Sequence, residues 1–381
     1  MGTRLALILL AAMLVACGGE KDNSEPPAPL TAIENPIKPF VNWVVDTRAS
    51  GNLAAYRLRP LIVDDRAYTI DTSGLVRSVD LAKGRSLWRY DTELEPISGL
   101  GGNAQVLIAS SRNGDLVAYR IAEKTLEKLW STRVGSEIRA IPQVVGEQVF
   151  VRSVDGRLTC LSLTDGSELW QVSRRVPALS LTGNSEPLVA GDLVIAGFDD
   201  GKLTAYERSS GKTQWETTVS LARGRTEVER LVDLDASFVI RDGVIYAVAF
   251  QGHLAAVQAL SGDVLWSRPF SSFQAIAIDD NAIYLSSEDS DLWSIDRRTG
   301  TAFWKQDVLH ARKITAPAII GDKLVVADFE GYLHWFEKSD GRLVGRVRAT
   351  SERNYVQPQM WQDSVITMDQ LGMLASFSYQ P

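Results

Sequence analysis

The sequence predicts an all-β fold, an eight-bladed β-propeller of four-stranded antiparallel blades, and three observations lead to it. A turn centred on glycine recurs at spacings of 40, 42, 45, 51, 38, 41 and 41 residues. A tryptophan follows a second turn in most of these units. The chain also carries a spare strand before the first unit and lacks one after the last. Four short strands repeated at this period are typical of propeller blades.

The first turn of each unit joins two strands. A β-branched or aromatic run precedes it, as at residues 149–151, and an alternating strand follows, as at residues 158–163. A hairpin turn needs positive φ, which glycine adopts without steric cost. None of these glycines opens a helix, as a phosphate-binding loop would, so a structural role is predicted. The turns centre on Gly74, Gly114, Gly156, Gly201, Gly252, Ser290, Gly331 and Gly372.

The tryptophans mark the outer strand of each blade. In most units a tryptophan stands four residues after the glycine of the second turn, as Trp170 follows Gly166. A large aromatic side chain there would bury its ring against the neighbouring blade, so these residues are predicted to dock the blades on one another. Gly345 fills the one remaining slot, which predicts looser packing at that junction. The predicted docking residues are Trp43, Trp88, Trp130, Trp170, Trp215, Trp266 and Trp304.

The two ends of the repeat predict how the ring closes. Trp43 lies upstream of any complete unit, and only one strand follows Gly372. We expect residues 40–45 to pair as the outer strand of the C-terminal blade, because this removes two exposed strand edges at once. The propeller is therefore predicted over residues 39–381.

The N-terminus has the features of a bacterial lipoprotein. Arg4 precedes an apolar run at residues 5–14, which is too short to span a bilayer and indicates a signal peptide over residues 1–16. The ending Leu-Val-Ala-Cys17 resembles the lipobox, in which the cysteine is acylated; a plain signal peptide followed by a chance cysteine is the alternative. Residues 17–38 are expected to be a flexible tether after lipidated Cys17.

The residue after this cysteine bears on location. Gly18 replaces the aspartate that marks inner-membrane retention in enterobacterial lipoproteins. We therefore expect the outer membrane, with the protein facing the periplasm and touching the membrane only through its lipid anchor.

Composition argues against nucleic-acid binding and catalysis. The chain has 40 Lys and Arg against 47 Asp and Glu, a net charge of −7, which does not favour phosphate backbones. Its two cysteines exclude a disulfide scaffold. The histidines fall in three different repeats, and Cys160 alternates with apolar residues on a predicted strand. No nucleophile motif is present. We expect no catalytic residues, no cofactor and no metal.

Two long insertions are the candidate binding site. Residues 171–186 and 216–236 occupy consecutive blade junctions, so in a ring they must lie side by side on one face. The first carries apolar Leu179 and Leu181, and the second is rich in charged residues. An apolar centre with a charged rim suits a protein interface. The alternative is that the two loops fold over the propeller mouth and pack on each other.

The chain also resembles a known family. Turns such as residues 164–170 and 298–304 are similar to the tryptophan-docking repeat of eight-bladed quinoprotein propellers. Together with the lipobox and the two insertions, they make the whole chain resemble the BamB family, the lipoproteins of the outer-membrane β-barrel assembly machine. The resemblance implies a non-catalytic scaffold that docks on the POTRA domains of BamA and assists barrel folding and insertion. Unfolded outer-membrane proteins are a second candidate partner.

The resemblance also implies the contact residues. Leu179 and Leu181 match the apolar positions of the family's interface, and Asp233 and Asp235 match the acidic ones. Thr182 stands where the family has arginine, so one charged contact is absent or comes from a neighbour such as Arg174 or Arg175.

A different function class stays open at this point, a periplasmic quinone-dependent dehydrogenase of the same propeller superfamily. Such enzymes typically carry a vicinal cysteine pair and a calcium-bound quinone, whereas Cys160 is the one cysteine here besides Cys17. Absorbance after reconstitution with quinone and calcium separates the two functions, because a bound quinone is coloured.

Overall fold

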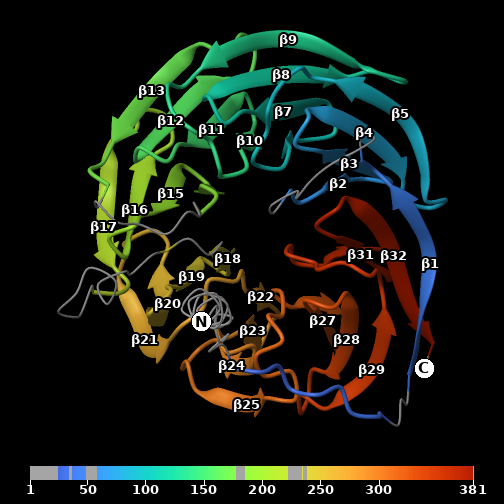
Figure 1. Cartoon of the computed structure of the whole chain (residues 1–381). Helices are drawn as coiled ribbons and strands as arrows, with labels where there is room; N and C mark the ends of the chain where they lie inside the picture. The colour runs from blue at the N-terminus through green and yellow to red at the C-terminus, as the bar shows by residue number, and fades with distance from the viewer. Residues whose placement is uncertain are drawn as a thin grey trace, which may run out of the picture.

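The chain forms a ring of eight antiparallel sheets (Figure 1). The structure is a computed structural model, and it describes residues 25–33, 37–48, 58–176, 185–221, 234 and 238–380. Each sheet has four strands that pair in order from the ring axis outward. The predicted eight-bladed propeller is confirmed. The described residues include no helix long and apolar enough to cross a membrane.

The first four blades follow one another along the chain. Blade 1 contains β2 (Leu61–Val63), β3 (Arg66–Ile70), β4 (Leu75–Asp80) and β5 (Arg85–Asp91). Blade 2 contains β6 (Gly101–Gly102), β7 (Val106–Ser110), β8 (Asp115–Ile121) and β9 (Leu126–Arg133). Blade 3 contains β10 (Gln143–Val145), β11 (Gln148–Arg152), β12 (Arg157–Ser162) and β13 (Glu168–Ser173). Blade 4 contains β14 (Leu188–Ala190), β15 (Leu193–Gly197), β16 (Lys202–Glu207) and β17 (Thr213–Thr218).

The last four blades complete the ring. Blade 5 contains β18 (Val239–Arg241), β19 (Val244–Val248), β20 (Gly252–Gln258) and β21 (Val264–Phe270). Blade 6 contains β22 (Ala277–Ile278), β23 (Ala282–Ser286), β24 (Leu292–Asp296) and β25 (Ala302–Gln306). Blade 7 contains β26 (Ala318–Ile320), β27 (Lys323–Ala327), β28 (Tyr332–Glu337) and β29 (Leu343–Arg348). Blade 8 contains β30 (Gln359–Trp361), β31 (Ser364–Met368), β32 (Met373–Gln380) and β1 (Lys38–Asp46).

The ring closes through its N-terminal strand. β1 pairs antiparallel with β32, from Lys38 opposite Gln380 to Asp46 opposite Met373. The predicted outer strand at residues 40–45 is therefore confirmed. The two ends of the described propeller lie in one sheet, so no blade is left without its outer strand.

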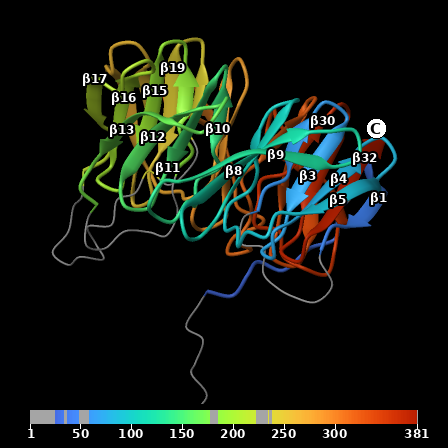
Figure 2. The same cartoon turned by 90° about the horizontal axis from the view of Figure 1, so that it is seen from above.

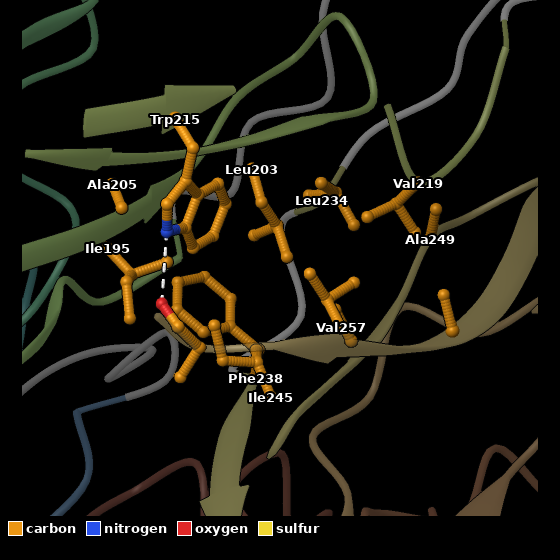
Figure 3. Packing of buried hydrophobic residues seen from close by; sticks show 13 residues of the cluster. Ile195, Leu203, Ala205, Trp215, Val219, Leu234, Phe238, Ile245, Ala249 and Val257 are labelled. Atoms are coloured by element: carbon orange, nitrogen blue, oxygen red, sulfur yellow. Dashed lines mark hydrogen bonds between the residues drawn. The ribbon is translucent and has the colours of Figure 1, made fainter. Parts of the chain in front are cut away.

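Burial follows from the stacking of the blades. The two middle strands of each blade are almost wholly buried, as in β11 and β12, because both of their faces pack against neighbouring sheets. Outer strands are mostly exposed; in β13 Trp170 is the one buried residue. The core is thus a set of apolar clusters between blades, and one of the largest lies between blades 4 and 5 (Figure 3).

Tryptophans of the outer strands reach the next blade. The Trp170 Nε1 donates to the Arg208 carbonyl at 2.9 Å, and its ring lies where a Cβ on Gly211 would be only 2.7 Å away. Glycine therefore stands in the second turn for its small size as well as for its positive φ of 72°. The same ring-on-glycine contact recurs for Trp43 on Gly84, Trp130 on Gly166, Trp215 on Gly262, Trp266 on Gly300 and Trp304 on Gly341.

Two junctions depart from this contact. The Trp88 Nε1 is buried without a hydrogen-bond partner, and the facing turn of blade 2 has no glycine. At the slot of Gly345, Ile37 and Pro39 occupy the space of the missing tryptophan, and a Cβ on Gly345 would lie 2.9 Å from both. Ile37 is buried in the core between blades 7 and 8. The looser packing expected there is not found, because the N-terminal segment fills the slot.

The segment before the closing strand also differs from expectation. Residues 25–33 lie against blades 6 and 7, although the composition of this stretch suggested a free tether. Its proline-rich backbone has few internal partners, and the Ala28 amide instead donates to the His310 carbonyl at 2.9 Å. Residues 1–16 and Cys17 lie outside the described residues.

Candidate docking surface

The two insertions connect the outer strand of one blade to the inner strand of the next, from β13 to β14 and from β17 to β18. Five predicted contact residues lie outside the part of the chain that the structure describes, namely Leu179, Leu181, Thr182, Asp233 and Asp235. The structure instead shows what holds both insertions at their bases.

Arg174 holds the start of the first insertion. Its backbone amide donates to the Gly156 carbonyl at 3.0 Å, which fixes the chain where β13 ends. Its guanidinium pairs with Glu216 at 2.6 Å and with Asp200 at 3.2 Å. Burial alone would lower the pKa of Arg174, but these two carboxylates raise it. Arg174 is therefore already paired with acidic groups, whereas the neighbouring Arg175 is exposed.

Ser185 marks the return of the first insertion. Its hydroxyl accepts a hydrogen bond from Arg152 at 3.0 Å, and Arg152 also pairs with Asp199 at 2.9 Å. The Arg152 side chain is only 2% exposed. Removing either member of such a buried pair would leave an uncompensated charge, so this anchor tolerates little change.

Phe198 joins the two anchors of the first insertion. The Arg152 guanidinium lies 4.9 Å from the centre of its ring, and the Arg174 guanidinium lies 4.6 Å from it. Both distances are within the range of cation–π attraction. The two ends of the first insertion are therefore held by one stack of Arg152, Phe198 and Arg174.

The second insertion is anchored by an apolar core. The Ser220 amide donates to the Gly201 carbonyl at 3.1 Å where β17 ends, and the next residue, Leu221, is exposed. Further along, Leu234 is 1% exposed and packs with Leu203 and Val219 in the cluster between blades 4 and 5 (Figure 3). In the sequence Leu234 stands between the two predicted acidic contact residues. Its side chain attaches the insertion to the propeller at this position.

Gly197, at the end of β15, lies where the two insertions meet. A Cβ on Gly197 would lie 3.0 Å from both the Ser185 hydroxyl and the Leu234 Cβ. The described ends of the two insertions thus lie side by side over blade 4, as their consecutive positions in the ring predicted. Sequence reasoning missed Arg152, Ser185 and Leu234, because their burial depends on residues far apart in the chain.

Cys160 and the three histidines lie outside the two insertions. Cys160 is buried, and burial raises the pKa of its thiol to about 12, which disfavours the thiolate. The three histidines stand in blades 5 and 7 and in the loop between blades 6 and 7. Among the described residues, no three His, Cys, Asp or Glu side chains are grouped as a metal site would require.

Comparisons with known proteins place this arrangement in a family. A family model described as "Outer membrane protein assembly factor BamB" matches residues 72–306. A protein of that name from Alkalilimnicola ehrlichii is 38% identical over 347 residues, which cover 91% of this chain and 89% of the relative. The crystal structure of BamB from Moraxella catarrhalis superposes with a TM-score of 0.81 at 23% identity, covering 90% of this chain and all of that one.

A dehydrogenase shares the fold at much lower sequence identity. A europium-containing methanol dehydrogenase superposes with a TM-score of 0.73, but it is only 11% identical over 89% of this chain and 93% of that chain. Likeness at this level shows a common propeller fold alone, so the dehydrogenase alternative is not favoured. The full-length relatives and the matching family model agree on one assignment: the chain belongs to the BamB family of outer membrane protein assembly factors.

Proposed function

We propose that this chain is a non-catalytic scaffold lipoprotein of the outer-membrane β-barrel assembly machine, and that it docks on the POTRA domains of BamA through its two insertions. The names of its relatives support the assembly role. The docking role adds Leu179 and Leu181 as the apolar centre of the interface and Asp233 and Asp235 as its acidic part. Thr182 is the fifth proposed contact residue. Unfolded outer-membrane proteins are a further candidate partner of the same scaffold.

The observation that carries the proposal is the pair of anchors over blade 4. Ser185 and Leu234 bring two long insertions together at Gly197, and each insertion has its own buried support. Loops held at their bases in this way can present side chains with little loss of entropy on binding. An interface whose apolar centre and charged rim come from two such loops fits a folded protein partner.

Copurification of BamA from cells tests the docking role. Replacing Leu179 and Leu181 together with aspartate should abolish recovery of BamA, because it places charge in a desolvated centre. The matched control replaces Leu260 and Leu265 with aspartate, since both are exposed leucines away from the insertions. Equal recovery of BamA with both variants would contradict the proposal.

The membrane part of the proposal rests on Cys17. Acylation there would anchor the chain to the outer membrane, facing the periplasm, after removal of residues 1–16. A Cys17→Ser variant should accumulate as an unacylated precursor, whereas Cys160→Ser should not. Acylation of the Cys17→Ser variant would contradict the lipid anchor.

A further inference from the structure

Residues 25–33, which we call the strap, bind to the propeller along the loop that joins blades 6 and 7. Ala28 uses both of its backbone groups there: its amide donates to the His310 carbonyl at 2.9 Å, and its carbonyl accepts from the Arg312 guanidinium at 3.0 Å. The Thr31 carbonyl accepts from Arg346 at 3.1 Å. In Figure 1 the blue strap passes close to β25 and β29.

Side chains of the strap add two contacts. Glu25 reaches the His310 Nε2 at 3.3 Å, while the His310 Nδ1 faces Asp291 at 3.1 Å. With a carboxylate on each ring nitrogen, His310 holds strap and propeller together best as the imidazolium. Leu30 packs against the apolar cluster between blades 6 and 7. The strap is thus held by backbone, charged and apolar contacts.

The propeller groups that receive the strap are fixed independently of it. Arg312 is 3% exposed and pairs with Asp328 at 2.8 Å. His334 also contacts Asp328, with its Nε2 3.0 Å from that carboxylate, and its Nδ1 accepts from Arg346 at 3.2 Å. Arg312 and Arg346 therefore point N–H groups at the strap from one buried network. A preorganised receptor of this kind favours a defined bound segment over a mobile one.

The strap lies on the same face of the ring as the two insertions. The two insertions are loops that join an outer strand to the inner strand of the next blade, and the strap lies beside a third loop of this kind. Each of these three loops pairs with the turn between the two middle strands of the preceding blade. Ala311 donates to the Asp289 carbonyl in such a turn, as Ser220 does to Gly201 and Arg174 to Gly156. Figure 2 shows the blue strap on the lower side of the ring.

We propose that the strap binds this face to set how the propeller sits on the membrane, with the insertion-bearing face held toward the bilayer. The inference rests on the proposed anchor at Cys17. Glu25 comes eight residues after Cys17, whereas Lys38 comes twenty-one residues after it. At about 3.5 Å per extended residue, the docked strap shortens the maximum reach from about 74 Å to about 28 Å.

Amide exchange of the mature, acylated protein tests whether the strap is bound. The Ala28 amide should be protected in the wild type and should exchange at least tenfold faster in Leu30→Asp, which puts a charge in the apolar contact. Ala32→Asp is the matched control, because Ala32 is exposed on the same segment, and its exchange should stay within twofold of the wild type. Equal exchange in Leu30→Asp and the wild type would overturn the proposal.

Energy transfer to the membrane tests the orientation. A fluorophore is placed on Ser351→Cys, in a loop of the strap face, or on Ser339→Cys, in a turn of the opposite face; both serines are exposed and Cys160 is buried. On phosphatidylethanolamine vesicles with a headgroup acceptor, transfer from position 351 should be at least twice that from position 339. The Leu30→Asp change should remove this difference, and Ala32→Asp should keep it.

The outcomes separate the strap from the anchor. Failure of the wild type to bind vesicles would overturn the anchor at Cys17 and the orienting role with it. Vesicle binding with equal transfer from the two faces would overturn the strap's role alone.

Discussion

The outer strands of the eight blades and the contacts between neighbouring blades form what we call the wall of the propeller. The contacts of the wall differ in kind from those at the insertion bases over blade 4. Six wall junctions use one device, a tryptophan ring on a glycine turn with the indole N–H bonded to a carbonyl, as in Trp215 on Gly262. The insertion bases share no such part. One rests on the Arg152–Phe198–Arg174 stack and the other on buried Leu234. The repeated contact holds blades together at many junctions of the ring. The contacts at the insertion bases occur once each, so they distinguish blade 4 from the other blades.

The largest effect should come from breaking the closure of the wall. Deleting residues 38–46 removes β1 with Trp43 and exposes the edge of β32. Loss of one docked tryptophan alone costs about 3–5 kcal/mol, and the unpaired edge adds to it. We expect the unfolding free energy of the variant, measured by thermal denaturation, to be lower than that of the full-length protein by at least this amount. An unchanged melting temperature would show that the ring closes without β1.

A smaller effect should separate two tryptophans of the same wall. Trp215→Ala should cost about 3–5 kcal/mol of unfolding free energy, because it empties a buried cluster and leaves the Ala259 carbonyl without its donor. Trp88→Ala should cost about 1 kcal/mol less, since the Trp88 Nε1 has no hydrogen bond to lose. Urea denaturation measures both. A Trp88→Ala variant as unstable as Trp215→Ala would show that the indole hydrogen bond adds nothing.

The repeat and its closure could be predicted because they depend on local signals. A glycine at positive φ, a tryptophan at fixed spacing and a surplus strand at one end each have a meaning that needs no knowledge of distant residues. The Gly345 slot could not be predicted, because Ile37 reaches it from more than three hundred residues away in the chain. The docked strap was missed for the same reason. Its composition is that of a linker, and its partners Arg312 and Arg346 lie in another part of the sequence.

The sequence could predict that the two insertions are neighbours, but not which contacts hold their bases. Two insertions at consecutive junctions of a ring must be neighbours, and Ser185 and Leu234 do meet at Gly197. The arginine anchors could not be read from the sequence, because Arg152 and Asp199 pair between blades. The roles of Leu179, Leu181, Thr182, Asp233 and Asp235 stay predictions.

The smallest effect should be a pH dependence of the strap contact. Hydrogen bonds from His310 to Asp291 and then to Glu25 raise the pKa of His310 above its usual 6.5. Lys305 also pairs with Asp291, at 2.7 Å. The strap contact should therefore be complete below about pH 6.5 and weaken as pH rises through the raised pKa. NMR titration of His310 should give a lower pKa in Glu25→Gln than in the wild type. An identical pKa would place Glu25 away from His310.

The central claim is that the wall carries the fold while the insertions carry the docking, and paired measurements of affinity and stability test it most directly. The dissociation constant for BamA and the melting temperature are measured for the wild type, Trp215→Ala and the Leu179/Leu181→Asp double variant. We expect the double variant to lose at least about a hundredfold in affinity, about 3 kcal/mol, with an unchanged melting temperature. Trp215→Ala should melt lower yet bind normally at temperatures where it is folded. Normal affinity of a fully folded double variant would contradict the account.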